Sequence, residues 1–299
     1  MSLSIRRVSP ALGAEICDID LAQPLSKATI NAIEEAWYEH LILVFRNQHI
    51  SDAELIAFSK NFGELDSPPI GTSHRYWVEG FPEVLVVSNV IENGVPIGNL
   101  GAGEVDWHSD MSYEEVPPIG SLLYALEVPP TGGSTEFVNM YAAWESLTSD
   151  LQRRVEGLSI KHDGSVNAAG QLRLGQQPVT DVVTCPGPIH PVVRTHPKTG
   201  RKALYIGRRR NAYVCGLSVA ESEQLLNELW SRSTQPELTW KHEWQVGDVV
   251  FWDNRCTMHR RDPFDPNARR LMHRTQLREK QPQVPVADKT SRVYESSAV

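Results

Sequence analysis

A histidine and an aspartate stand two positions apart in the segment 106–110, whose sequence is Asp-Trp-His-Ser-Asp. On an extended strand, residues two positions apart project from the same face, so the imidazole of His108 and the carboxylate of Asp110 could both reach one metal ion. His259, far downstream, could supply a third ligand. Two imidazoles and one carboxylate leave open positions for a chelating co-substrate and O₂, which is the ligand set of non-haem Fe(II) oxygenases. The spacing therefore predicts an open iron site, whereas a structural zinc site would be closed.

The segments around the third ligand are more informative than the His-x-Asp pair, which occurs by chance in many proteins and alone usually marks an ordinary strand edge. The apolar run Asp248–Arg255 follows a turn, and we expect it to form a buried strand that delivers His259. The segment Arg269–Leu277 is predicted to form another strand, with Arg270 and Arg274 on one face. Two arginines on one face repel each other unless an anion lies beside them. Without an anion, they would belong to an ordinary solvated face.

Taken in order, these motifs resemble the taurine dioxygenase family of Fe(II)- and 2-oxoglutarate-dependent oxygenases. The resemblance covers most of the chain, and the ordered set is far more specific than any one motif. The segments that carry it are Leu12-Gly13-Ala14-Glu15-Ile16, Asp18-Ile19-Asp20-Leu21, Leu43–Gln48, Trp107–Asp110, Thr131-Gly132-Gly133-Ser134-Thr135, Gly216-Leu217-Ser218, Trp252–Arg255, His259, Arg270 and Arg274.

The resemblance implies a role for each matching polar residue. It makes His108, Asp110 and His259 the iron ligands. Arg270, eleven residues after the last ligand, would pair with the distal carboxylate of 2-oxoglutarate. A guanidinium suits that role because its planar fork can donate two hydrogen bonds to one carboxylate. Thr135 would add a hydroxyl beside the same carboxylate; taken alone, it would be an ordinary strand threonine after a glycine turn.

Three residues bear on the substrate: Arg274, Glu104 and His74. Arg274 would face either the other end of the co-substrate or an anionic group of the substrate. Glu104 stands where the taurine enzyme has a substrate-binding amide. A carboxylate there would disfavour a sulfonate and could receive an ammonium group. His74 falls in the region that forms the family's substrate lid, and its alternative is a polar loop histidine. We therefore expect the protein to hydroxylate a small carboxylate-bearing, amino-acid-like molecule. It would bind Fe(II), consume 2-oxoglutarate and O₂, and release succinate and CO₂.

Three alternatives remain at this point. The first is cleavage of sulfonates or aryloxyalkanoates by the same chemistry. The second, from a different class, is a jelly-roll protein that binds a metal or small ligand without turnover. The third is a metal hydrolase with zinc in the same triad, but such an enzyme would normally need an acid/base such as the glutamate of His-Glu-x-x-His, and the sequence has no such motif. In the last two classes the arginine pair would have no role.

The elements expected around these residues are short strands with a few packing helices. Capping boxes predict helix starts at Ser51 and Ser218, and a third helix is expected near Ala28–His40. Eight or more short strands with few helices suit a jelly roll, in which two sheets face each other and the metal lies in the mouth. The resemblance implies its cupin-like, double-stranded β-helix version, so the expected class is mainly β with flanking helices. The expected strands are Leu41–Phe45, Val84–Val90, Ser121–Val128, Thr135–Met140, Val192–Thr195, Ala203–Ile206, Asp248–Trp252 and Arg270–Leu277.

Composition favours a single enzyme domain. The chain has 299 residues without a Pro/Gly/Ser-rich linker, so we expect one dioxygenase domain over residues 1–279 and a polar, loosely held C-terminal tail over residues 280–299. A hydrophobic fraction of 40% and eight tryptophans are ample for a core. No apolar run approaches the roughly 18 residues needed to span a bilayer, and the N-terminus lacks a signal-peptide core. We expect a cytoplasmic protein.

Charge and cysteine usage narrow the partners. A net charge of −8 argues against nucleic acid, which needs a basic surface. The cluster Arg208–Arg210 could be an ordinary solvated turn or a lip that attracts an anionic substrate. The four cysteines show no Cys-x-x-Cys spacing, so neither a disulfide framework nor a zinc ribbon is indicated, and Cys256 is interpreted as a small buried residue. We expect a small-molecule substrate and no membrane partner; the sequence is compatible with a homo-oligomer.

Overall fold

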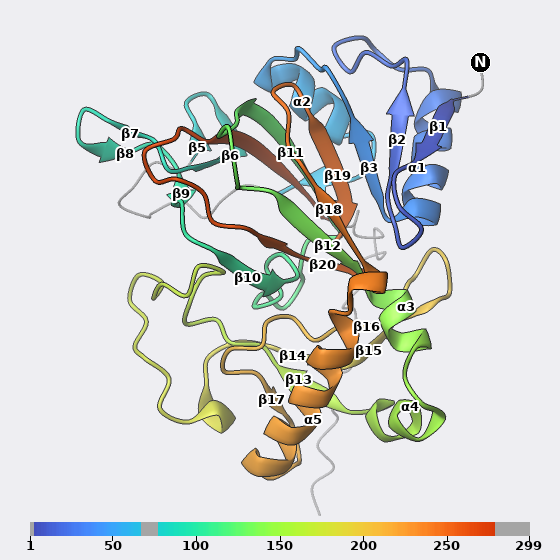
Figure 1. Cartoon of the computed structure of the whole chain (residues 1–299), viewed down its shortest axis with the longest axis vertical. Coiled ribbons are helices and arrows are strands. Elements are labelled where there is room, and N and C mark those ends of the chain that lie inside the picture. Colours follow the sequence, from blue (N-terminus) through green and yellow to red (C-terminus); the bar gives the residue numbers. More distant parts are fainter. Residues whose placement is uncertain (1–2, 67–76, 279–299) are drawn as a thin grey trace, which may run out of the picture.

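The computed structural model describes residues 3–66 and 77–278, which consist mainly of short β-strands with a few helices packed outside them (Figure 1). Ten strands form the largest sheet: β1 (Ser4–Arg7), β2 (Ala14–Cys17), β3 (Ile42–Phe45), β4 (Glu64–Leu65), β5 (Trp77–Val78), β6 (Phe81–Ser88), β9 (Asn99–Leu100), β11 (Gly120–Glu127), β19 (Val249–Asp253) and β21 (Leu271–Arg278). Its main path has the order β1-β2-β3-β19-β11-β21-β6-β5, with β4 paired to β21 and β9 to β6. The neighbours of β11 are β19 and β21, so segments that follow residue 248 lie at the centre of this sheet.

A second sheet carries two of the expected metal ligands, His108 and His259. It contains β10 (Val105–His108), β12 (Thr135–Asn139), β18 (Thr239–His242) and β20 (Thr257–Arg261), in the order β10-β20-β12-β18, and every pairing is antiparallel. In Figure 1 it lies close to the large sheet, with β20 between β10 and β12. Because β10 and β20 are direct neighbours, residues about 150 positions apart in the chain are brought side by side.

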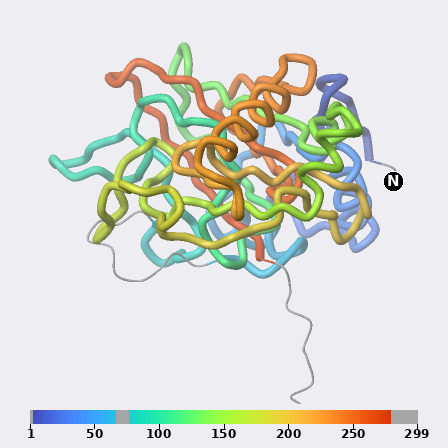
Figure 2. Tube along the Cα trace, turned by 90° about the horizontal axis from the view of Figure 1, so that it is seen from below, coloured from blue at the N-terminus to red at the C-terminus, as the bar shows by residue number. Residues whose placement is uncertain are grey.

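The remaining elements lie around these two sheets. Helices α1 (Lys27–His40) and α2 (Asp52–Ser59) pack on the ten-stranded sheet, and α5 (Val219–Ser233) lies at the lower end in Figure 1, nearest the viewer in Figure 2. The other elements are α3 (Met140–Glu145), α4 (Ser149–Val155), the 3₁₀ turns Val182–Thr184 and Pro236–Leu238, the hairpins β7 (Ile91–Glu92) with β8 (Val95–Pro96) and β15 (Val193–Thr195) with β16 (Lys202–Leu204), and a small sheet of β14 (Ile189–Pro191), β13 (Ser159–Lys161) and β17 (Tyr213–Val214).

Strand β3 shows how the large sheet is buried on both faces. All four of its residues are buried, and successive strand side chains point to opposite faces. Ile42 and Val44 belong to the core that also contains Phe137 of the four-stranded sheet. Leu43 and Phe45 belong to a second core, beneath α1 and α2. A strand covered on both faces is expected to be apolar throughout, which explains the unbroken Ile-Leu-Val-Phe sequence.

The expected class, mainly β with a few helices, is confirmed. Each of the eight expected strands overlaps an observed one, and all three expected helices are present, with complete capping boxes at Ser51 and Ser218. Among the elements that sequence reasoning missed are α3, α4 and the strand β20 that carries His259. No helix among the described residues is long and apolar enough to cross a membrane. His74 and the expected tail, residues 280–299, lie outside the described residues.

Candidate metal and co-substrate site

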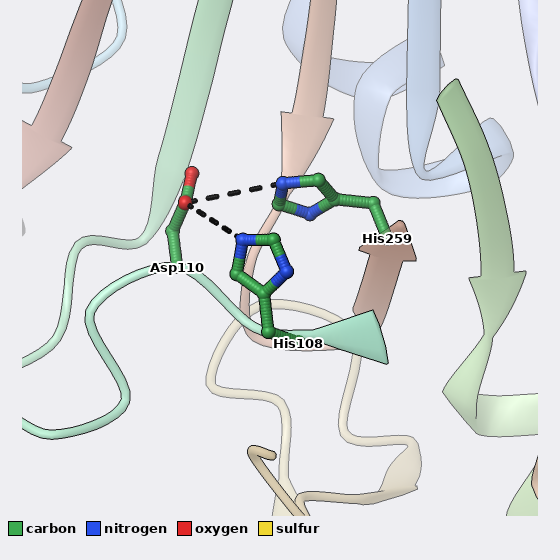
Figure 3. A group of neighbouring side chains, drawn as sticks. All are labelled: His108, Asp110 and His259. Carbon is green, nitrogen blue, oxygen red and sulfur yellow. Dashed lines mark ion pairs between the residues drawn. The ribbon is translucent and has the colours of Figure 1, made fainter. Parts of the chain in front are cut away.

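Three side chains that could hold a metal ion meet where β10 and β20 pair (Figure 3). The antiparallel register sets His108 directly opposite His259, with 4.2 Å between the ring centroids. Oδ1 of Asp110 lies 3.7 Å from Nε2 of His108 and 3.9 Å from Nε2 of His259. All three side chains are buried. One ligand atom from each lies within 4.8 Å of the others, so one ion could contact all three.

Asp110 reaches this position from a turn and not from a strand. We expected His108 and Asp110 to share one strand face, but β10 ends at His108, so that part of the prediction is wrong. The chain then turns sharply, and Met111 has a positive φ of 47°. Ser109 holds the turn beside β20, because its hydroxyl donates to the carbonyl of Thr257 at 3.1 Å. The turn, and not the alternation of a strand, aims the carboxylate at the two imidazoles.

Neighbouring groups fix the orientation of two of these side chains. Nδ1 of His108 lies 2.8 Å from the carbonyl oxygen of Asp106. Because a carbonyl oxygen only accepts, Nδ1 must carry the hydrogen and donate this hydrogen bond, which leaves the Nε2 lone pair free for a metal. Oδ2 of Asp110 accepts a hydrogen bond from the Ser121 hydroxyl at 2.7 Å. Nδ1 of His259 is buried and has no hydrogen-bond partner among the described residues.

The charges at the site suit a divalent cation. Burial alone would raise the pKa of Asp110, but the guanidinium of Arg274, with Nη1 3.1 Å from Oδ1, and the two imidazoles hold this pKa far below its usual range. Burial, aided by the nearby His108, lowers the pKa of His259 to about 3. At neutral pH the site therefore offers an anionic carboxylate and a neutral His259, the protonation states that metal binding requires. A nitrogen and oxygen donor set of three residues fits Fe(II) and leaves further positions open.

A small cavity adjoins these ligands. Its volume is about 40 Å³, and it is partly open to the solvent. Three arginines are among its walls, which makes the wall strongly cationic. The residues that line it are Val87, Leu100, Val105, His108, Leu123, Thr135, Trp252, His259, Arg261, Arg270 and Arg274.

Arg270 is a buried cation that has no carboxylate partner among the described residues. Its side chain is held at its base, where Asn89 accepts from the Arg270 backbone N–H at 2.9 Å and Ser88 donates to its carbonyl at 2.7 Å. Arg270 is 2% exposed, and among residues 3–66 and 77–278 its guanidinium forms no ion pair or hydrogen bond. Burial, followed by repulsion from Arg261, lowers its pKa to about 9. Buried charges are ordinarily paired, so this side chain is suited to receive an anion from outside the chain.

Thr135 lies on the wall of the same cavity. Its hydroxyl oxygen accepts from Nε1 of Trp244 at 2.9 Å, and the guanidinium of Arg270 lies 6.0 Å from the Trp244 ring centroid. The Thr135 hydroxyl donates to none of the described residues, so its proton is available to a ligand. Thr135 and Arg270 therefore converge on one part of the cavity, as the resemblance implies.

Of the three residues proposed to contact the substrate, the structure places Arg274 in the cavity wall and Glu104 outside it. Arg274 lies in the cavity wall, beside Asp110, and its Nη2 lies 3.3 Å from Oε1 of Gln276. The Glu104 side chain is 55% exposed, and its carboxylate faces Arg260 at 3.9 Å on the outer side of the sheet. Glu104 is not part of the cavity wall, so the structure gives no support to its proposed contact with an ammonium group. His74, as stated above, lies outside the described residues.

Arg261 is a cavity residue that sequence reasoning missed. It follows His259 by two positions on β20, so the alternation that placed Arg270 and Arg274 together could have found it. The signal was obscured because β20 itself was not predicted as a strand.

The cluster Arg208–Arg210 is neither a simple solvated turn nor part of the metal cavity. Arg209 forms an ion pair with Glu223, whereas Arg208 and Arg210 donate to backbone carbonyls. Together they border a separate, larger hollow of about 230 Å³, which Trp107 and Trp230 also line.

A second cluster, His196 with Asp253 and Cys256, also has metal-ligand composition, but its groups are already used. Nδ1 of His196 accepts from two backbone N–H groups, and Nε2 donates to Asp253 at 3.0 Å. Burial raises the pKa of the Cys256 thiol well above its usual value, so the thiol stays protonated. Cys256 is a small buried residue, as expected, and all four cysteines are free.

Comparison with known proteins identifies the family. Residues 4–276 match the taurine catabolism dioxygenase TauD, TfdA family, and the chain belongs to this family. It is 38% identical over 283 residues to the alpha-ketoglutarate-dependent 2,4-dichlorophenoxyacetate dioxygenase of Cupriavidus pinatubonensis, covering 92% of this chain and 97% of that protein. It is 34% identical over 292 residues to the (S)-phenoxypropionate/alpha-ketoglutarate-dioxygenase of Sphingobium herbicidovorans, covering 92% and 95%.

Solved structures agree with this assignment. The structure of AAD-2 in complex with Mn(II) and N-oxalylglycine superposes with a TM-score of 0.75 at 32% identity, covering 95% of this chain and 100% of that one. The chain is therefore an alpha-ketoglutarate-dependent dioxygenase that acts on a small molecule. Alpha-ketoglutarate is 2-oxoglutarate, so the family assignment and the arginine-lined cavity point to the same co-substrate.

Proposed function

We propose that this dioxygenase uses Fe(II) held by His108, Asp110 and His259, and that it oxidises a small aryloxyalkanoate-type carboxylate with release of succinate and CO₂. The observation that carries the proposal is the buried triad beside Arg270, a buried guanidinium that lacks a carboxylate partner among the described residues. A metal site without an anion pocket would have no use for that charge, which would be costly to leave unpaired.

The chain's residues would act by binding and orientation. Bound iron would supply activation of O₂ for oxidation of a C–H bond. His108 and His259 would present neutral Nε2 atoms and Asp110 an anionic oxygen. Arg270 would donate hydrogen bonds from its guanidinium to the distal carboxylate of 2-oxoglutarate, and the Thr135 hydroxyl would be a second donor. Arg274, beside Asp110, would face the substrate's carboxylate.

An aryloxyalkanoate is favoured over an amino-acid-like substrate for two reasons. The relatives described above are named for 2,4-dichlorophenoxyacetate and phenoxypropionate, both of which are aryloxyalkanoates. Glu104, the residue that would have received an ammonium group, faces Arg260 outside the cavity. Hydroxylation of the carbon next to the ether oxygen would give an unstable hemiacetal. Its bond between that carbon and the aryl oxygen would break, giving a phenol and an oxo acid whose carbonyl is the hydroxylated carbon.

We further propose that the two main sheets form the double-stranded β-helix, and that residues 1–279 are one domain followed by a tail over residues 280–299. The shared core between the sheets, to which Val44 and Phe137 both contribute, supports a single folding unit.

A substrate screen that measures succinate tests the function. Aryloxyacetates should support succinate formation with an equal amount of phenol released, whereas amino acids should not. In Arg274→Ala, substrate-dependent succinate should fall by at least tenfold because the carboxylate loses its partner. Arg278→Ala is the matched control, since Arg278 ends the same strand but pairs with Asp66 outside the cavity. Turnover of amino acids without turnover of aryloxyacetates would refute the proposed substrate class.

A further inference from the structure

We propose that Arg261 is a second arginine for the distal carboxylate of 2-oxoglutarate, and that it connects this carboxylate to the loop that precedes His108. The inference rests on the proposed function, since it assigns a residue to the same co-substrate pocket. It adds a contact that neither the motifs nor the metal ligands indicate.

The position of Arg261 follows from strand register. On β20 it lies two residues after His259, so both side chains project from the same face. Across the sheet, Arg261 pairs with Thr135 of β12 on one side and with Val105 of β10 on the other. Directly opposed residues in a sheet present their side chains to the same face, so Arg261 lies beside the Thr135 hydroxyl. Both residues line the cavity, together with Arg270.

The hydrogen bonds of Arg261 leave its charge uncompensated. The residue is 5% exposed, and its Nη2 donates to the carbonyls of Leu100, at 3.1 Å, and Gly103. Its Nε is buried without a partner, and no carboxylate pairs with it in the described part of the chain. Backbone carbonyls satisfy donors but do not neutralise a buried cation. With Arg270, the cavity therefore holds two guanidiniums that no carboxylate of the described residues pairs with, and a carboxylate bound between them would pair with both.

The neighbouring Arg260 is a useful comparison, because its charge is paired with a carboxylate of the protein itself. Its side chain projects from the opposite face, where Nη2 pairs with Oε2 of Glu136 at 2.6 Å and the guanidinium stacks 5.3 Å from the Trp107 ring centroid. Within residues 3–66 and 77–278, Arg260 therefore has a carboxylate partner and Arg261 has none, although they are adjacent in sequence.

The contacts with Leu100 and Gly103 also connect Arg261 to the loop that precedes His108. These carbonyls belong to the segment that leads into β10, the strand that ends at His108. A carboxylate bound by Arg261 would thus be linked, through a single side chain, to the backbone that positions a metal ligand.

The test compares two ligands that differ only at the distal end. 2-Oxoglutarate and 2-oxopentanoate have the same chain length, but only the first has a distal carboxylate. Their dissociation constants for the Mn(II)-loaded protein are measured by calorimetry for wild type, Arg261→Gln, Arg261→Lys and the control Arg260→Gln. We expect Arg261→Gln to weaken 2-oxoglutarate by about tenfold or more and 2-oxopentanoate by less than about twofold. Arg261→Lys should lose less, because it keeps the charge, and Arg260→Gln should resemble wild type.

Equal losses for the two ligands would overturn the inference, because they would show that Arg261 only supports the loop. Unchanged affinity for 2-oxoglutarate in both Arg261 variants would overturn it as well. If Arg261→Gln does not fold, as judged by its thermal melting curve, the comparison of Arg261→Lys with wild type decides. Failure of the wild-type protein to bind 2-oxoglutarate would instead contradict the proposed function, so the two failures are distinguishable.

Discussion

Two adjacent arginines illustrate how burial distinguishes a functional side chain from an ordinary one. Arg269 has a side chain that is 53% exposed and forms a two-pronged pair with Glu127. Arg270 is buried, with no carboxylate partner among the described residues. An exposed ion pair contributes little, about 0–1 kcal/mol, so Arg269 is replaceable. A buried, unpaired guanidinium is costly for folding, and its presence is explained by a ligand that pairs with it.

This contrast supplies a matched pair of variants. Arg270→Lys keeps the charge but loses the fork, and a charge-assisted hydrogen bond contributes roughly 1.5–3 kcal/mol. The affinity for 2-oxoglutarate should fall by about tenfold or more, since each 1.4 kcal/mol or so is a factor of ten. Arg269→Lys should leave it unchanged. Titration of the metal-loaded protein measures both, and an unaltered curve for Arg270→Lys would move the anchor to another residue.

Among the elements, those specified by local chemistry were predictable from the sequence. The helices at Ser51 and Ser218 begin where a serine and a glutamate three positions later form a capping box, a device contained in four residues. The strand Val249–Asp253 was predictable because its apolar run is longer than a turn and shorter than a helix.

Strand β20 could not be predicted in this way. Its sequence, Thr-Met-His-Arg-Arg, has no alternation and no apolar run, because burial of His259 and Arg261 serves the cavity and not the core. Its extended form comes from pairing with β10 and β12 on its two edges, which are distant in sequence. For the same reason Arg261 was missed, while His259 was found from the apolar run that precedes it and from the family resemblance.

The register of β20 decides which side chains reach the cavity. A slip of one residue would turn His259 outward and Arg260 inward, because strand side chains alternate. The ion pair between Arg260 and Glu136, which are directly opposed across β20 and β12, favours the observed register. Asp110 shows the limit of such reasoning, since a turn and not a register places its carboxylate.

At the scale of the whole molecule, one core joins the sheet that carries the histidines to the sheet that carries Arg274. Val250, Trp252 and Met272 contribute to it from the ten-stranded sheet, and Phe137 and Met258 from the four-stranded sheet. The triad lies where the two sheets approach, so its geometry depends on the packing of both. Global unfolding and loss of the site should therefore occur together.

The pH dependence of stability provides a prediction at this scale. His162 is buried beside His190 and Tyr205, and burial, with the nearby His190, lowers its pKa to about 3. In the unfolded chain its pKa would be near 6.5, so between about pH 6.5 and 3 the unfolded state binds the proton and the folded state does not. The contribution of His162 to stability is complete above pH 6.5 and is lost as the pH falls, by about 2 kcal/mol between pH 7 and 5.

Urea unfolding at several pH values measures this contribution. His162→Gln should show a flatter decline of the unfolding free energy between pH 7 and 5, by about the same 2 kcal/mol. His49→Gln is the control, because His49 is exposed and should leave the slope unchanged. Parallel pH profiles for wild type and His162→Gln would show that other groups dominate acid unfolding.

The central claim is that His108, Asp110 and His259 hold iron next to 2-oxoglutarate, and absorption spectroscopy without O₂ tests it most directly. Fe(II) followed by 2-oxoglutarate should give the wild-type protein a visible charge-transfer band, because chelation of Fe(II) by this co-substrate absorbs visible light. His259→Ala should retain neither the iron nor the band while keeping the wild-type circular dichroism spectrum. A wild-type protein that gives no band, or a His259→Ala variant that gives the full band, would contradict the account.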